Sequence, residues 1–234
     1  AALLALGCAC GYLLGGRYPM EWAPVDAGEH SGVEESKARL LALGVPDYVL
    51  NDLTAEDLAA CDGAIQVVVD VDDYPVNSGR VEHYWPGSSA VRTVYDVKEL
   101  RITGVGVELP GERWMLIQHF LWTTPPVFRG TESIQLWPAY RAGMEGWRSG
   151  GALTGRVLYD EGGQTYAAPY CFLGEQTFAY DSLFWGQQIR DDLFAAFSLP
   201  RDGANCRGYL AYPIERVRDG YIVDGWFNYT HQQS

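Results

Sequence analysis

The 234-residue sequence predicts a mainly β fold, an antiparallel β-sandwich, and three observations predict it. Aromatic residues make up 13% of the chain, and 27 glycines and 12 prolines accompany them, which favours short strands joined by tight turns. The apolar runs follow one another as hairpins, without the strand–helix–strand rhythm of a parallel sheet. Residues 113–122 are apolar on both faces when read with a period of two, which is typical of a strand covered on both sides.

Residues 1–16, which precede this β-rich region, contain no charged side chain and predict a single membrane anchor. Sixteen residues are slightly fewer than the roughly 20 that cross a bilayer, so we expect further apolar residues upstream. A cleaved signal peptide is an alternative, and so is a lipoprotein signal that ends at Cys8. The apolar run continues past Cys8 to Leu14, which favours the anchor. The bulk of the chain is then expected outside the cytoplasm.

A linker and a short helical segment are expected next. Residues 17–32 contain prolines and glycines among polar residues and are predicted to be the linker. Residues 33–63 predict three helices: the first ends at Gly44, the second begins at Pro46, and Thr54 caps the third.

Two stretches of the sequence resemble a known group of proteins. They are GVPDYVLNDLTAEDLAACDG at 44–63 and WFNYTHQ at 226–232. Both are similar to segments of uncharacterised, membrane-anchored extracytoplasmic proteins of Gram-positive bacteria. The resemblance implies a membrane anchor and an extracytoplasmic location, and it implies no activity, because those proteins have none assigned.

Residues 64–234 are predicted to form the sandwich-like domain. The turn Leu109-Pro110-Gly111-Glu112 joins 97–109 to the central strand 113–122 as a hairpin. Helix-like structure is expected after Asp181 and a strand from about Leu193. Further strands are expected at 65–72, 131–137, 156–160, 164–168, and in a last hairpin, 207–218 with 221–229, over Asp219-Gly220.

The charge distribution excludes one class of partner. The net charge is −13, and residues 26–73 alone carry twelve carboxylates against two bases. Nucleic acid is therefore not an expected partner, because phosphate backbones require a basic surface.

Asp70, Asp72 and Asp73 do not form an EF-hand calcium loop, since Tyr74 and Pro75 stand where that loop needs a ligand and a glycine. We expect exposed carboxylates on an edge strand and no metal site.

No catalytic motif stands out, and the candidate catalytic residues are three. His119 on the central strand could act as a general base, with Glu132 or Asp160 orienting it. The alternative is a structural histidine bonded within the core, which we favour. The sequence has no nucleophile elbow, P-loop or dinucleotide-binding glycine pattern, so no cofactor is expected.

Aromatic and cysteine residues complete the list of candidates. Exposed Trp85, Trp147 and Trp185 could stack on sugar rings or contact a partner. Cys171 and Cys206 either form a bridge or, with Cys61, remain thiols.

Taken together, these features predict a non-catalytic extracytoplasmic binding domain for a protein or an envelope glycan. The alternatives are a sandwich-fold hydrolase and a carbohydrate-binding module.

Overall fold

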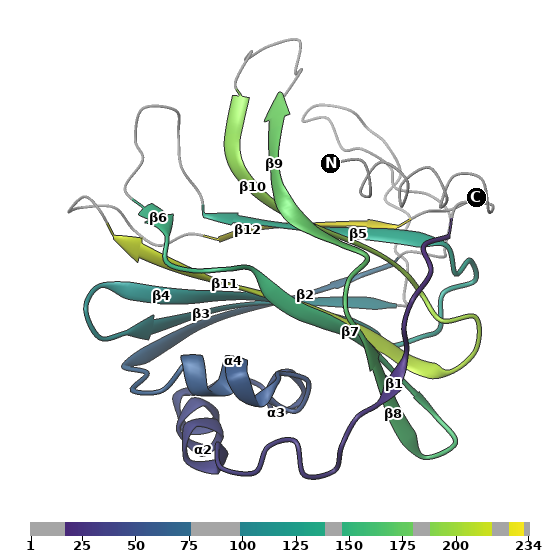
Figure 1. Cartoon of the computed structure of the whole chain (residues 1–234), viewed down its shortest axis with the longest axis horizontal. Helices are drawn as coiled ribbons and strands as arrows, with labels where there is room; N and C mark the ends of the chain where they lie inside the picture. The colour runs from purple at the N-terminus through teal and green to yellow at the C-terminus, as the bar shows by residue number, and fades with distance from the viewer. Residues whose placement is uncertain (1–16, 76–98, 139–146, 180–187, 217–224, 232–234) are drawn as a thin grey trace, which may run out of the picture.

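The protein is a three-layer, mainly β structure (Figure 1). The computed structural model describes residues 17–75, 99–138, 147–179, 188–216 and 225–231. Two antiparallel sheets form the middle layer and one outer layer, and short helices form the other outer layer. The predictions of a mainly β fold and of antiparallel pairing are confirmed.

The larger sheet forms the middle layer. Within the described residues it runs in the order β1 (Ala23–Pro24), β8 (Gln164–Ala168), β7 (Thr154–Glu161), β11 (Ala204–Arg216), β4 (Arg113–Trp122), β3 (Leu100–Leu109) and β2 (Gln66–Tyr74), with the short β6 (Trp147–Ser149) paired to the end of β11. The smaller sheet runs in the order β12 (Gly225–His231), β5 (Thr131–Pro138), β10 (Gln188–Ser198) and β9 (Phe172–Ala179).

Strand β4 lies inside the larger sheet, between β11 and β3, and is covered on both faces as its sequence predicts. It forms a hairpin with β3 through a turn in which Gly111 has a φ of 79°, a conformation that favours glycine. Its Leu116 and Phe120 face the smaller sheet, where the Phe120 ring stacks on Phe197 with ring centroids 5.3 Å apart. Its Ile117 belongs to the core on the helix side. Both faces are therefore buried, which explains why both are apolar.

The helices cover the second face of this sheet (Figure 1). They are α2 (Glu34–Leu43), α3 (Asp47–Leu50) and α4 (Ala55–Ala60). Gly44 ends α2 with a φ of 109°, and Thr54 Oγ1 caps α4 by accepting the Asp57 backbone N–H at 3.2 Å. Leu40, Leu50 and Leu58 are fully buried against the sheet, so the helical segment is part of the core.

The segment that follows residues 1–16 is fixed to the sheets, although its sequence predicts a linker. The Tyr18 N–H donates to Ser198 Oγ at 2.6 Å, and β1 pairs with β8. Met20 and Trp22 pack against the core between the sheets. These apolar residues recur at every second position, which suits an extended chain with one buried side. Residues 1–16 lie outside the described part; within it, no helix is long and apolar enough to cross a membrane.

The end of the chain differs from its prediction. Strands β11 and β12 belong to different sheets, since β11 pairs with β4, β6 and β7, and β12 pairs with β5. The expected hairpin ladder between them is therefore wrong for the described residues, and the turn at 219–220 lies outside those residues.

Strand β10 begins at Gln188, earlier than expected. The prediction of helix-like structure is therefore wrong for residues 188–192, and residues 181–187 lie outside the described part.

Pro213 shows why β11 tolerates a proline although it lies inside the sheet and is not an edge strand. Its pairing with β7 ends at Ala211, and its pairing with β6 begins at Ile214. Pro213 therefore lies where the neighbouring strand changes, and its missing N–H breaks no ladder there.

Cys61, Cys171 and Cys206 are free thiols, so the alternative of a bridge between Cys171 and Cys206 is wrong.

Candidate functional site

His119 lies in a buried polar network beneath the helices, and neither Glu132 nor Asp160 orients it. Its side chain is fully buried, and its Nε2 is 2.7 Å from Asp52 Oδ2. The Asp52 carboxylate accepts there, so Nε2 carries the proton. Asp52 Oδ1 also accepts from Arg207 Nε at 2.7 Å, and Arg207 Nη1 donates to Asp160 Oδ1 at 3.0 Å. Asp160 thus joins the network of His119 only through Arg207 and Asp52.

The charges of this network stabilise one another. Burial opposes the charged form of Arg207, but Asp52 and Asp160 outweigh burial and raise its pKa. Burial also opposes ionisation of Asp160. Hydrogen bonds from Asn205 and Thr165, together with the Arg207 charge, outweigh it and lower the Asp160 pKa. Arg207 and Asp160 therefore each favour the charged form of the other.

Two further contacts tie the helical layer to the sheet. Arg156 reaches Glu29 with both terminal nitrogens, with Nη2 2.8 Å from Oε2, and its Nε donates to the Asp52 carbonyl at 3.0 Å. Asp57 accepts hydrogen bonds from the Tyr209 hydroxyl and from Thr154 Oγ1. These contacts join the layers of the fold without a ligand, whereas the buried His119 Nδ1 has no hydrogen-bond partner among the described residues.

Glu132 lies on the opposite side of the larger sheet from His119. It is in β5 of the smaller sheet and is buried, and its Oε1 is 2.8 Å from His231 Nδ1. The His231 ring in turn contacts Trp122, on the face of β4 that packs against the smaller sheet. Burial raises the pKa of Glu132, and the hydrogen bond and charge of His231 offset that effect only in part. The three catalytic candidates are therefore not brought together in one site.

Of the three candidate tryptophans, Trp147 alone lies within the described residues. Trp147 lies in β6, opposite Arg216 in the strand register. Trp85 and Trp185 lie outside the described residues. Within the described ranges, no group of three or more His, Cys, Asp or Glu side chains is arranged to hold a metal ion.

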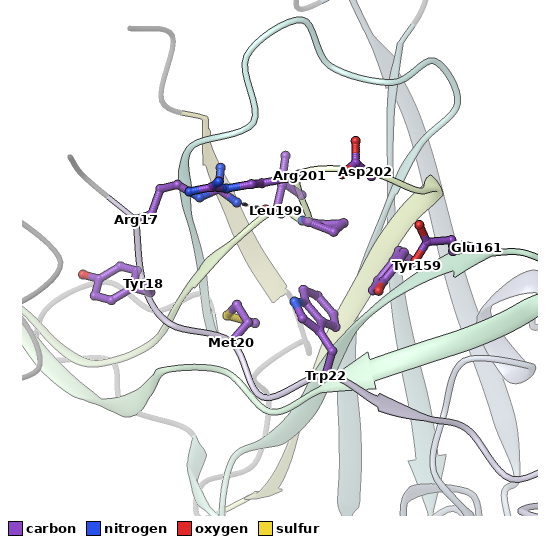
Figure 2. A pocket seen from close by; sticks show the side chains of 10 residues that line it. Arg17, Tyr18, Met20, Trp22, Tyr159, Glu161, Leu199, Arg201 and Asp202 are labelled. Carbon is purple, nitrogen blue, oxygen red and sulfur yellow. Dashed lines mark hydrogen bonds between the residues drawn. The ribbon is translucent and has the colours of Figure 1, made fainter. Parts of the chain in front are cut away.

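A cavity of about 320 Å³ opens where the start of the described chain meets the sheets, and we call it the Trp22 pocket (Figure 2). Its walls come from three segments: residues 17–22, the end of β7 with Tyr159 and Glu161, and residues 199–202 between β10 and β11. Sequence reasoning missed this pocket, because residues 17–32 predict a linker. The alternation of Tyr18, Met20 and Trp22 was the available signal.

Aromatic rings form the floor of the Trp22 pocket. Trp22 and Tyr159 form a T-shaped contact with ring centroids 4.8 Å apart, and Tyr159 stacks on Tyr166 at 5.3 Å. Gly203 permits this packing: its φ is 95°, and a Cβ there would lie 2.3 Å from the Tyr159 ring. Trp22 remains half-buried, so part of its ring faces the cavity.

Arg17 and Arg201 line the other end of the pocket, and Arg129 lies close to Arg17. Arg17 donates to the carbonyl oxygens of Arg129 and Leu199, and Arg129 donates to the Gly203 carbonyl at 3.1 Å. Burial lowers the pKa of Arg17, and the charges of Arg201 and Arg129 lower it further. In the part of the chain that the structure describes, no carboxylate forms an ion pair with any of the three.

The charged groups of the pocket are segregated. Figure 2 shows Arg17 and Arg201 together at one end, Met20 and Trp22 in the middle, and Glu161 at the other end, with Asp202 on the same side as Glu161. The pocket therefore combines a cationic end, an apolar and aromatic middle, and an acidic end.

No protein-family model, no curated protein and no solved structure matches this chain. The assignment of function therefore depends on the geometry of the pocket and of the buried networks.

Proposed function

We propose that the chain is a non-catalytic binding domain, tethered to a membrane by residues 1–16, that acts outside the cytoplasm and binds its ligand in the Trp22 pocket. The observation that carries the proposal is the pocket itself. A concave, partly aromatic cavity with a few convergent charged groups is the usual form of a ligand site, and 320 Å³ is enough for a small molecule.

The positions of the acid–base candidates support binding over catalysis. A general base must come within hydrogen-bond reach of its substrate, directly or through one water molecule. His119 is fully buried and bonded to Asp52, and Glu132 is buried and bonded to His231. Neither residue lines the Trp22 pocket. Both pairs are therefore assigned to the stability of the fold.

The position of the pocket along the chain supports a ligand at the membrane or in the envelope. Arg17, which lines the pocket, directly follows the apolar segment 1–16, and Trp22 is five residues further on. An extended chain spans about 3.3–3.6 Å per residue, so a tether at residue 16 keeps the pocket within roughly 20 Å of the bilayer. An envelope glycan is the alternative to a small membrane-associated ligand, because the Trp22 ring could also stack on a sugar.

Binding is tested with the full chain in alkyl maltoside micelles, screened by thermal shift against small polar molecules and soluble envelope glycans. A ligand at 100 times its Kd should stabilise the folded state by about 2.7 kcal/mol. We expect at least one ligand whose shift disappears in Trp22→Ala and persists in Val127→Ala, a matched control at a side chain that is 87% exposed. Glycosidase, peptidase and esterase substrates form the catalytic arm. Turnover that is lost in a folded His119→Ala variant would reject the proposal.

The tether is tested by fractionation of cells that express the full chain. The protein should stay with membranes through a high-salt or carbonate wash and leave with detergent. Release by salt alone would reject the anchor and leave the binding proposal to the ligand screen.

A further inference from the structure

The two ends of the Trp22 pocket have opposite charge, which constrains its ligand. We infer that the pocket binds a zwitterion with a phosphate at one end and an ammonium group at the other, as in choline phosphate and ethanolamine phosphate. The inference rests on the proposed function, because it assumes that this pocket is the binding site.

The arginine end supplies the phosphate site. Arg17 and Arg201 line the pocket, and Arg17 donates a hydrogen bond to the backbone carbonyl of Arg129. Burial lowers the pKa of Arg17, and the charges of Arg201 and Arg129 lower it further, so an anion placed beside these arginines would offset an unfavourable charge environment. Guanidinium groups bind phosphate oxygens in a fork of two hydrogen bonds, and this geometry favours phosphate over a spherical anion.

The opposite end supplies the ammonium site. Glu161 lies there beside the ring of Tyr159, and Asp202 also lines the pocket on that side, with its carboxylate directed away from the ring. The Trp22 ring, which is nearly perpendicular to that of Tyr159, lines the same space. Aromatic faces attract a cation within about 6 Å of the ring centroid, and quaternary ammonium groups are recognised in this way.

The balance of charge favours a zwitterion over a simple anion or cation. The lining holds two arginines and two carboxylates, so a ligand without net charge complements it. Inorganic phosphate would leave the carboxylates without a partner, and choline would leave the arginines without one. The apolar middle, with Met20 and Trp22, suits the short carbon linker between the two groups.

The test is isothermal titration of the full chain in alkyl maltoside, whose head group carries no phosphate or ammonium. The probes are choline phosphate, ethanolamine phosphate, inorganic phosphate and choline chloride. We expect at least one zwitterion to bind at least tenfold more tightly than either half. Arg201→Gln should weaken its binding at least tenfold, and Asp202→Asn should weaken it by a smaller factor, since Glu161 remains. Arg113→Gln is the control, because Arg113 is an exposed arginine at the far end of β4.

Three outcomes would overturn the inference. Phosphate that binds as tightly as the zwitterions would make the pocket a simple anion site. Zwitterion binding that is unchanged in both Arg201→Gln and Asp202→Asn would place it elsewhere. No zwitterion binding, alongside another ligand that depends on Trp22, would reject the inference and keep the proposed function. The proposed function itself fails if no ligand in the screen depends on Trp22, or if the catalytic arm finds turnover that is lost in a folded His119→Ala variant.

The zwitterion could be a lipid head group or a soluble molecule, and liposomes separate the two sources. The full chain is reconstituted into phosphatidylcholine or phosphatidylglycerol liposomes and titrated with choline phosphate. Weaker binding in phosphatidylcholine means that lipid head groups occupy the pocket. Equal binding in both means that the ligand is soluble. Both results require the zwitterion site, and absence of binding in phosphatidylglycerol liposomes would contradict it.

Discussion

The arginines of this protein form two groups with different partners. Arg156 and Arg207 each pair with carboxylates, at Glu29 for the first and at Asp52 and Asp160 for the second. Arg17 and Arg129 donate only to backbone carbonyls in the described structure, and they lie with Arg201 in a cluster of like charge. A chain of net charge −13 has ample carboxylates for every arginine, so the second group is not explained by a shortage.

The difference separates stability from binding. A buried ion pair whose hydrogen bonds are complete within the fold leaves nothing for a ligand to contact, and removing one partner exposes the other to an apolar surrounding. A cluster of cations that lines a cavity has the opposite property, because a suitable anion improves its energy. Substitutions of Arg156 or Arg207 should therefore lower the free energy of unfolding. Substitutions of the arginines at the pocket should instead weaken ligand binding.

The largest expected effect is at the paired arginine beneath the helices. Arg207→Ala should lower the free energy of unfolding by about 3–5 kcal/mol, because the buried Asp52 side chain would lose its guanidinium partner. Urea denaturation of the full chain in detergent measures it. A loss below about 1 kcal/mol would mean that His119 alone satisfies Asp52, and it would weaken the comparison.

Apolar contacts in the same sheet provide the reference for that value. Phe120→Ala should lower the free energy of unfolding by about 3–5 kcal/mol, since Phe120 is fully buried against Phe197 and its removal leaves a cavity. The same urea experiment applies, with Val127→Ala as the exposed control. A loss below about 0.5 kcal/mol would contradict the assignment of β4 as a strand covered on both faces.

A smaller effect concerns pH. The pKa of Asp160 is lowered in the folded state, so the group contributes stability that is present above its unfolded pKa near 3.8 and is lost as the pH falls through its folded pKa. Wild type should therefore be more stable than Asp160→Asn at pH 7, and the difference should shrink as the pH falls below about 4. Denaturation midpoints of both proteins between pH 3 and 7 provide the test. A difference that is constant with pH would show that ionisation of Asp160 does not stabilise the fold.

Much of the fold was predictable because its signals are local. The both-face apolar pattern of β4, the Pro-Gly turn before it, and the caps at Gly44 and Thr54 each depend on neighbouring residues. Pairing between distant strands carries no such signal, and this is why the Asp-Gly sequence at 219–220 led to the wrong partner for β12.

The candidate site was not predictable for the same reason. Its walls come from residues near positions 20, 160 and 200, and only the folded chain brings them together. The His119 partner, Asp52, lies 67 positions away within an acidic stretch that the sequence indicates only as solvated surface. Prolines and glycines in residues 17–32 masked the apolar alternation that fixes this segment to the sheets.

The most direct test of the account compares Arg201→Gln with Arg207→Gln in one experiment. Both replace a guanidinium by an amide, and urea unfolding with and without choline phosphate measures stability and binding together. We predict that Arg201→Gln changes the free energy of unfolding by less than about 0.5 kcal/mol and abolishes most of the ligand-induced stabilisation. Arg207→Gln should lower stability and keep the ligand-induced increment. The account would be contradicted if Arg201→Gln destabilised the fold as strongly as Arg207→Gln, or if it kept the full response to the ligand.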